Sequence, residues 1–181
     1  MRIRHLASLT LLASAGLGLA ACSGGEEQAS TAGGNGTAAT AASAEIMLAA
    51  LPDGAVGVAA AKPTVVEGDA VVLRGRIGGT RAPMTGESGI FLIMDPSLSP
   101  CPPDEGCPAP WDYCCETPDT KLANNATIQL VGADGDQLTA DFAALGLEPM
   151  DEVVVVGTVG PRPNTDVLLV KATGVHKVAG G

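Results

Sequence analysis

The residues best able to do chemistry in this chain of 181 residues lie together in one short segment, 100–116, which reads PCPPDEGCPAPWDYCCE. The segment contains four of the five cysteines: Cys101, Cys107, Cys114 and Cys115. It also contains the only tryptophan and the only tyrosine, Trp111 and Tyr113. Cysteine thiols form disulfides, bind soft metal ions or carry out thiol redox chemistry. The four cysteines therefore allow three kinds of site.

Two structural disulfides are the first interpretation. Four cysteines permit three pairings, and the sequence does not choose among them. A bond between Cys114 and Cys115 would strain the peptide that joins them, so we expect each to pair with a cysteine outside this dipeptide. Closing a loop of about seven residues contributes ~2.4 kcal/mol by the chain-entropy estimate. Trp111 and Tyr113 would then cover the disulfides or close one opening of the domain.

A metal site and a redox site are the alternatives. The spacing C-x5-C-x6-C-C lacks the closely spaced cysteine pairs of most zinc sites, whereas Cu(I) accepts thiolates in looser geometry. A reactive thiol needs positive charge nearby. Residues 100–119 instead contain five acidic residues and no Lys, Arg or His, which predicts raised thiol pKa values. The local charge thus counts against redox and metal chemistry and leaves the disulfide interpretation unaffected.

The N-terminus carries an export signal. Arg2 and Arg4 precede an apolar run, 6–19, which ends in Leu19-Ala20-Ala21-Cys22. This pattern resembles the lipobox of bacterial lipoproteins. The resemblance implies removal of residues 1–21, lipidation of Cys22 and attachment to a membrane on the extracytoplasmic side of the cell envelope, either in the periplasm or at the outer membrane. Such a compartment is oxidising, which favours disulfides among the remaining cysteines.

Residues 22–44 predict a disordered tether, because they lack large apolar side chains and are rich in Gly, Ala, Ser and Thr. The formal net charge of the chain is −10, and loss of Arg2 and Arg4 with the leader makes it more negative. That sign opposes binding to nucleic acid. Residues 45–64 are expected to form an N-terminal extension with a helical turn near 46–48 and a short strand near 56–58.

Alternating or β-branched runs predict five strands in the remaining domain, 65–178: 69–77, 89–95, 126–131, 152–158 and 167–176. Residues 138–147 predict a short helix between the third and fourth strands. This order is that of an all-β, OB-like five-stranded barrel. Two segments, 74–79 (RGRIGG) and 110–116 (PWDYCCE), resemble an uncharacterised family of bacterial lipoproteins, and that resemblance implies no known activity.

Other polar residues give weaker indications. Arg74 and Arg76 point to one face of a strand and, with Arg81, could bind an anionic ligand; the simpler interpretation is a solvated face paired with acidic residues. His176 is the only histidine after the leader, and no serine has a nucleophile-elbow context, so a catalytic triad is not expected.

The sequence therefore predicts a lipid-anchored, non-enzymatic binding or structural module without a cofactor. We expect Arg74, Arg76, Trp111 and Tyr113 to form its candidate binding surface for another envelope protein or a small ligand. The alternative is a copper- or zinc-binding or thiol-redox accessory protein that uses Cys101, Cys107, Cys114 and Cys115.

Overall fold

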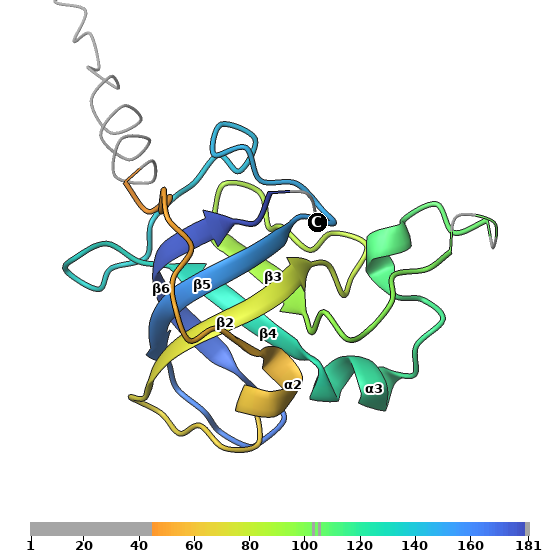
Figure 1. Cartoon of the computed structure of the whole chain (residues 1–181), viewed down its shortest axis with the longest axis horizontal. Coiled ribbons are helices and arrows are strands. Elements are labelled where there is room, and N and C mark those ends of the chain that lie inside the picture. The colour runs from red at the N-terminus through yellow and green to blue at the C-terminus, as the bar shows by residue number, and fades with distance from the viewer. Residues whose placement is uncertain (1–44, 103, 105, 180–181) are drawn as a thin grey trace, which may run out of the picture. The chain divides into compact units, whose positions relative to one another are not determined.

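The computed structural model describes residues 45–102, 104 and 106–179 (Figure 1). The predicted leader, the lipidation site Cys22 and the tether 22–44 lie outside the described residues. Within the described part of the chain, no helix is both long enough and apolar enough to cross a membrane.

Five strands form a closed barrel (Figure 1). They are β2 (Ala70–Ile77), β3 (Ile90–Met94), β4 (Asn125–Leu130), β5 (Glu152–Val159) and β6 (Leu169–Lys177). Their order around the barrel is β2-β3-β4-β6-β5, and pairing of β5 with β2 closes it. The β4–β6 pair is parallel, and the other pairs around the barrel are antiparallel. The predicted all-β, OB-like barrel is confirmed.

The alternation seen in the sequence directs apolar side chains into the barrel. In β2, Leu73 and Ile77 are fully buried while Arg74 and Arg76 lie on the outer face. Gly157 marks a β-bulge between β5 and β6, where a Cβ would lie 2.3 Å from the carbonyl oxygen of Lys171. Only glycine permits this close approach of two backbones in a strongly curved strand.

The N-terminal residues 45–64 belong to the barrel domain rather than to a separate extension. Strand β1 (Val56–Gly57) pairs with β2 in parallel, and α2 (Val58–Ala61) follows it directly. Val58 and Ala61 enter the barrel core, as does Ile46. The helical turn expected near 46–48 is wrong: Met47 forms a β-bridge with Val175 instead, and backbone hydrogen bonds on either side hold it there.

The predicted helix over 138–147 is also wrong. The segment forms turns, with the Asp141 carboxylate accepting hydrogen bonds from the N–H groups of Ala143 and Ala144. Gly146 then leaves the turn with a positive φ of 69°, so the chain cannot continue as a helix. A helix appears before β4 instead: α3 (Pro118–Ala123) begins at Thr117, whose hydroxyl accepts from the Thr120 N–H.

Candidate metal centre

The cysteine segment lies in the connection between β3 and β4, beside the barrel (Figure 1). Asp95 directly follows β3, at the start of this connection. Its backbone N–H donates to the Asn124 carbonyl oxygen at 2.8 Å, so the two ends of the connection meet. Its buried carboxylate accepts hydrogen bonds from the N–H groups of Ala59 and Ser97. Burial raises the pKa of this carboxyl, but the hydrogen bonds from Ser97 and Ala59 outweigh it and lower the pKa overall.

The cysteine segment packs against the two residues that follow β2, Gly78 and Gly79. The Gly79 N–H donates to the Trp111 carbonyl oxygen at 2.7 Å. A Cβ at Gly78 would lie 2.7 Å from the same oxygen and 2.9 Å from the Tyr113 ring. The absence of a side chain at Gly78 therefore lets the backbone of the segment sit directly on the barrel, whereas Gly79 is required by its positive φ of 101° and by the nearby Met94 side chain. The two sequence segments that carry the family resemblance, 74–79 and 110–116, thus contact each other.

Tyr113 turns the chain so that the last two cysteines face the first two. It follows a short 3-10 helix, η2 (Pro110–Asp112), and adopts a left-handed conformation with φ 54° and ψ 41°. Its side chain is fully buried, and its hydroxyl has no hydrogen-bond partner among the described residues. Burial raises the pKa of this hydroxyl, and the nearby Arg76 charge opposes that effect. Tyr113 therefore anchors the segment and does not belong to the surface predicted for it.

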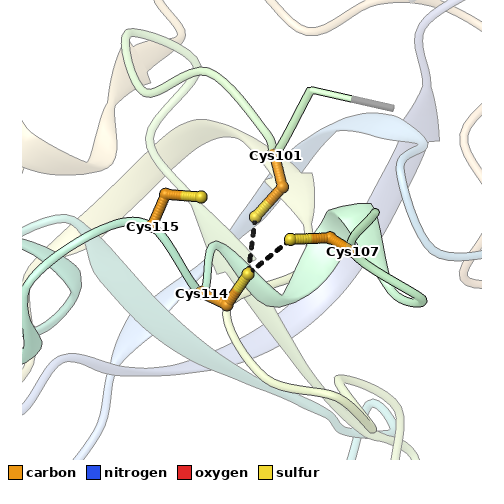
Figure 2. Close-up of side chains that lie close together, drawn as sticks. All are labelled: Cys101, Cys107, Cys114 and Cys115. Atoms are coloured by element: carbon orange, nitrogen blue, oxygen red, sulfur yellow. Dashed lines mark hydrogen bonds between the residues drawn. The ribbon is translucent and has the colours of Figure 1, made fainter. Parts of the chain in front are cut away.

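The four sulfur atoms gather in one place (Figure 2). All four Sγ atoms lie within 4.8 Å of one another. The Sγ of Cys114 is 3.1 Å from that of Cys101 and 2.7 Å from that of Cys107. Cys101 is buried, Cys107 is half-buried, and Cys114 and Cys115 are exposed. No disulfide joins any of the four described cysteines.

Three features of this geometry bear on its chemistry. A disulfide bond measures ~2.05 Å, so even the shortest sulfur–sulfur distance is a contact rather than a bond. A tetrahedral zinc site with Zn–S bonds of ~2.3 Å needs sulfur–sulfur separations of about 3.8 Å, which a cluster of this size accommodates after small side-chain rotations. The Sγ atoms of Cys101, Cys114 and Cys107 are not collinear, because the two contacts together exceed 4.8 Å. An in-line displacement at Cys114, which thiol–disulfide exchange between these three would use, is not set up.

The electrostatic setting differs from the acidic one that the sequence predicts. Arg76 reaches under the segment and donates to the Leu98 carbonyl oxygen at 3.4 Å, and Lys121 donates to the Asp112 carbonyl oxygen at 2.9 Å. Both cations come from outside residues 100–119, so the local sequence could not reveal them. The sequence singled out Arg76 only through its alternation with Arg74 on a strand, and it gave no signal for Lys121.

The thiols have unequal pKa values. Burial of Cys101 raises its pKa, but hydrogen bonds from the Cys114 side chain and from the Cys115 backbone N–H outweigh burial and lower the pKa to about 7. Hydrogen bonds to Cys114 and Cys101 raise the pKa of Cys107 to about 12. The pKa of Cys101 therefore lies near neutral pH, and the prediction of raised thiol pKa values is wrong for Cys101.

The remaining candidate residues lie apart from the sulfur atoms or have local partners. Arg74 pairs with the buried Glu152 of β5, and the Arg76 guanidinium lies 3.7 Å from the same carboxylate. Trp111 is half-buried, and its indole N–H donates to the Arg81 carbonyl oxygen at 3.1 Å. The His176 ring lies 2.9 Å from the Leu48 carbonyl oxygen, at the N-terminal residues that join β6.

Comparison with known proteins leaves the chain without a family. No protein family and no curated protein matches it. Among solved structures, the hypothetical protein ygiW from E. coli is similar at 14% sequence identity and a TM-score of 0.36, over 70% of this chain and 94% of that one.

Proposed function

We propose that this chain is a lipid-anchored protein of the bacterial cell envelope that binds a thiophilic metal ion, copper or zinc, at its four-cysteine centre. The supporting observation is the gathering of four Sγ atoms within 4.8 Å of one another. Thiolates are the ligands that select Cu(I) and Zn²⁺ over harder cations. The protein acts as a binding module: the cluster contains no imidazole or carboxylate that would serve as a general acid or base.

The position of Cys114 favours metal binding over disulfides. Its Sγ contacts two other sulfur atoms at once, Cys101 and Cys107, but it can form a covalent bond to only one of them. A metal ion can bind all the sulfur atoms together, as in four-cysteine sites. The lowered pKa of Cys101 acts in the same direction, because a metal binds the thiolate and must displace the proton from a thiol.

Metal content tests the proposal directly. The full-length chain, exported in its bacterial host and purified without oxygen, should contain about one equivalent of copper or zinc by elemental analysis. A variant with all four cysteines changed to serine should contain none and should retain its β-sheet circular dichroism spectrum. A protein that takes up neither ion after reduction and reconstitution with Zn²⁺ or Cu(I) would refute metal binding.

A disulfide-stapled structural module is the second candidate, favoured by the 2.7 Å contact between Cys107 and Cys114 and by the oxidising compartment that the lipobox implies. If it is correct, peptide mapping of the untreated protein should show Cys107 bonded to Cys114 and Cys101 bonded to Cys115. Denatured protein would then contain no titratable thiols. Four titratable thiols with bound metal would exclude it.

The membrane anchor is tested separately. Wild-type chain should fractionate with membranes and carry labelled fatty acid, whereas Cys22→Ser should do neither. Release of the wild-type chain as a soluble protein would show that the leader directs ordinary secretion.

A further inference from the structure

We infer that the short helix α2 and the adjoining Lys62 form a clamp that holds the cysteine segment in place, and that Lys62 is a positioning residue for the metal centre. The inference rests on the metal site proposed above and deepens it by naming a residue that sets the metal affinity without being a ligand. It is carried by hydrogen bonds from this clamp to both ends of the connection between β3 and β4, which contains the four clustered cysteines.

The N-terminal end of α2 binds the start of the connection. The Ala59 N–H, in the first turn of the helix, donates to the Asp95 carboxylate at 2.8 Å. An N–H group at this position has no partner within its own helix, so the carboxylate satisfies it. Gly57 precedes α2 and makes room for this contact, because a Cβ on it would lie 2.5 Å from a carboxylate oxygen of Asp95. Asp95 is therefore held against α2 at the point where the chain leaves β3.

Lys62 binds the other end of the connection. It is the C-cap residue of α2 and is only 3% exposed. Its ammonium donates to the backbone carbonyl oxygens of Leu122 and Asn125, at 2.5 and 2.8 Å, and to the side-chain oxygen of Asn125 at 3.0 Å. Leu122 lies in the last turn of α3, and Asn125 begins β4. An ammonium has three N–H donors, so these three oxygen atoms use its full capacity.

The buried charge of Lys62 keeps these oxygen atoms in place. Burial and the nearby Arg162 charge lower the pKa of Lys62 to about 8, and Asp166 opposes them, so the side chain is still protonated at neutral pH. Among the described residues, no carboxylate forms an ion pair with it. The oxygen atoms at the end of the connection therefore replace the water that the ammonium lost on burial. Their departure would leave a buried charge without partners, which is costly.

The clamp holds the connection on both sides of the cysteine cluster. The buried side chains of α2 belong to the barrel core, so the clamp is itself fixed. Cys101 lies shortly after Asp95 in the sequence, and Cys115 lies shortly before α3, which ends beside Lys62. Movement of either end of the connection would separate the four sulfur atoms, which now lie within 4.8 Å of one another. Ligands that are held in place in advance bind more tightly, because they lose less conformational freedom on binding.

Lys62→Met tests the clamp, because it keeps a long side chain and removes the ammonium. The affinity of the full-length protein for Zn²⁺ and for Cu(I), measured against chromogenic chelators, should fall by ~10-fold or more, because the connection loses its hydrogen bonds to a charged group. The measurement is made at a temperature where circular dichroism shows both proteins to be folded. Lys171→Met is the control, since it removes one positive charge from an exposed position of β6. Equal affinities of folded wild type and folded Lys62→Met would overturn the inference and leave Lys62 with a role in stability alone.

A second variant and a metal-free measurement separate this inference from the proposed function. Gly57→Ala acts at the opposite end of α2: Gly57 has a φ of −65°, which alanine adopts freely, so displacement of Asp95 is the main effect. In the metal-free protein, both Gly57→Ala and Lys62→Met should increase the quenching by acrylamide of Trp111, the only tryptophan, which lies in the cysteine segment. Unchanged quenching in both variants would overturn the clamp. Wild-type protein that binds neither Zn²⁺ nor Cu(I) would refute the proposed function, whereas increased quenching in the variants would still support the clamp.

Discussion

The backbone N–H of Gly79 donates a hydrogen bond to the carbonyl oxygen of Trp111 across 2.7 Å, and so joins the end of β2 to the middle of the cysteine segment. Immediately beyond this contact, Tyr113 turns the chain so that Cys114 and Cys115 face Cys101 and Cys107. The barrel thus contacts the segment at two glycines: Gly79 donates this hydrogen bond, and Gly78 has no side chain that would collide with Trp111 and Tyr113. Both glycines precede Trp111 by more than thirty positions in the sequence.

Gly78→Ala should disturb the cysteine centre while leaving the barrel folded. Its Cβ would lie 2.7 Å from the Trp111 carbonyl oxygen and 2.9 Å from the Tyr113 ring, and Gly78 does not need a positive φ, so the displacement is the main effect. We expect a loss of about 1–3 kcal/mol in the free energy of unfolding and weaker binding of copper or zinc. Gly86→Ala is the control for metal binding, because a Cβ there meets nothing within 4 Å; its positive φ of 51° means that this substitution also costs stability, through backbone strain rather than contact. Equal effects of the two substitutions on the affinity for copper or zinc would contradict the role of Gly78 in positioning the cysteine segment.

Tyr113→Phe should stabilise the protein. The substitution removes a buried hydroxyl that has no hydrogen-bond partner, and leaving such a group unsatisfied costs about 1–3 kcal/mol. Chemical denaturation of the two proteins measures the difference. Tyr113→Ala, which removes the whole buried ring, should instead cost about 3–5 kcal/mol. Destabilisation by Tyr113→Phe would show that the hydroxyl accepts a hydrogen bond in solution, with the nearby Arg76 guanidinium as the donor.

Glu152→Gln should destabilise the barrel. The buried Glu152 carboxylate faces both Arg74 and Arg76, and the substitution leaves the less exposed Arg76 without its counterion. We expect a loss of about 1.5–3 kcal/mol in the free energy of unfolding, as for hydrogen bonds to charged groups. Arg74→Gln should cost less, because the Arg74 side chain is 51% exposed and water replaces its partner. A larger loss for Arg74→Gln than for Glu152→Gln would contradict this ranking.

The reduced, metal-free protein should become more stable as the pH rises from 7 to 9. The pKa of Cys101 is about 7 in the folded protein against an ordinary value of 9.0, so between these values the folded state binds fewer protons than the unfolded state. The gain should be lost as the pH falls through 7, and above pH 9 the raised pKa of Cys107, about 12, should reverse the trend, because there the folded state binds more protons than the unfolded state. Denaturation of wild type and Cys101→Ser across this range isolates the effect, and thiolate absorbance should show one thiol ionising near neutral pH only in the wild type. Parallel stability curves for the two proteins would exclude the low pKa.

The strands could be predicted from the sequence because one repeating pattern along the chain is enough to identify them. Alternation of apolar and polar residues in β2 and β4, and the valine run of β5, depend only on which face of a strand is buried. The predicted helix over 138–147 failed although Leu138, Phe142 and Leu145 have helical spacing. The Leu138 N–H donates to the Leu130 carbonyl oxygen of β4, and Phe142 and Leu145 lie in a turn that Asp141 caps and Gly146 ends. Apolar spacing over so few residues does not distinguish a helix from a compact turn.

By itself the amino-acid sequence determined the barrel, the acidic charge and the presence of four thiols in one segment, because these follow from composition and from the period of two along a strand. Only the tertiary structure decided what surrounds the thiols. It brought four Sγ atoms within 4.8 Å of one another, placed Arg76 beneath the segment and buried Tyr113. The physical reason is that burial and sulfur–sulfur contacts depend on positions in space: burial and the other three cysteines set the pKa of Cys101, and their placement follows from how the segment packs against the barrel.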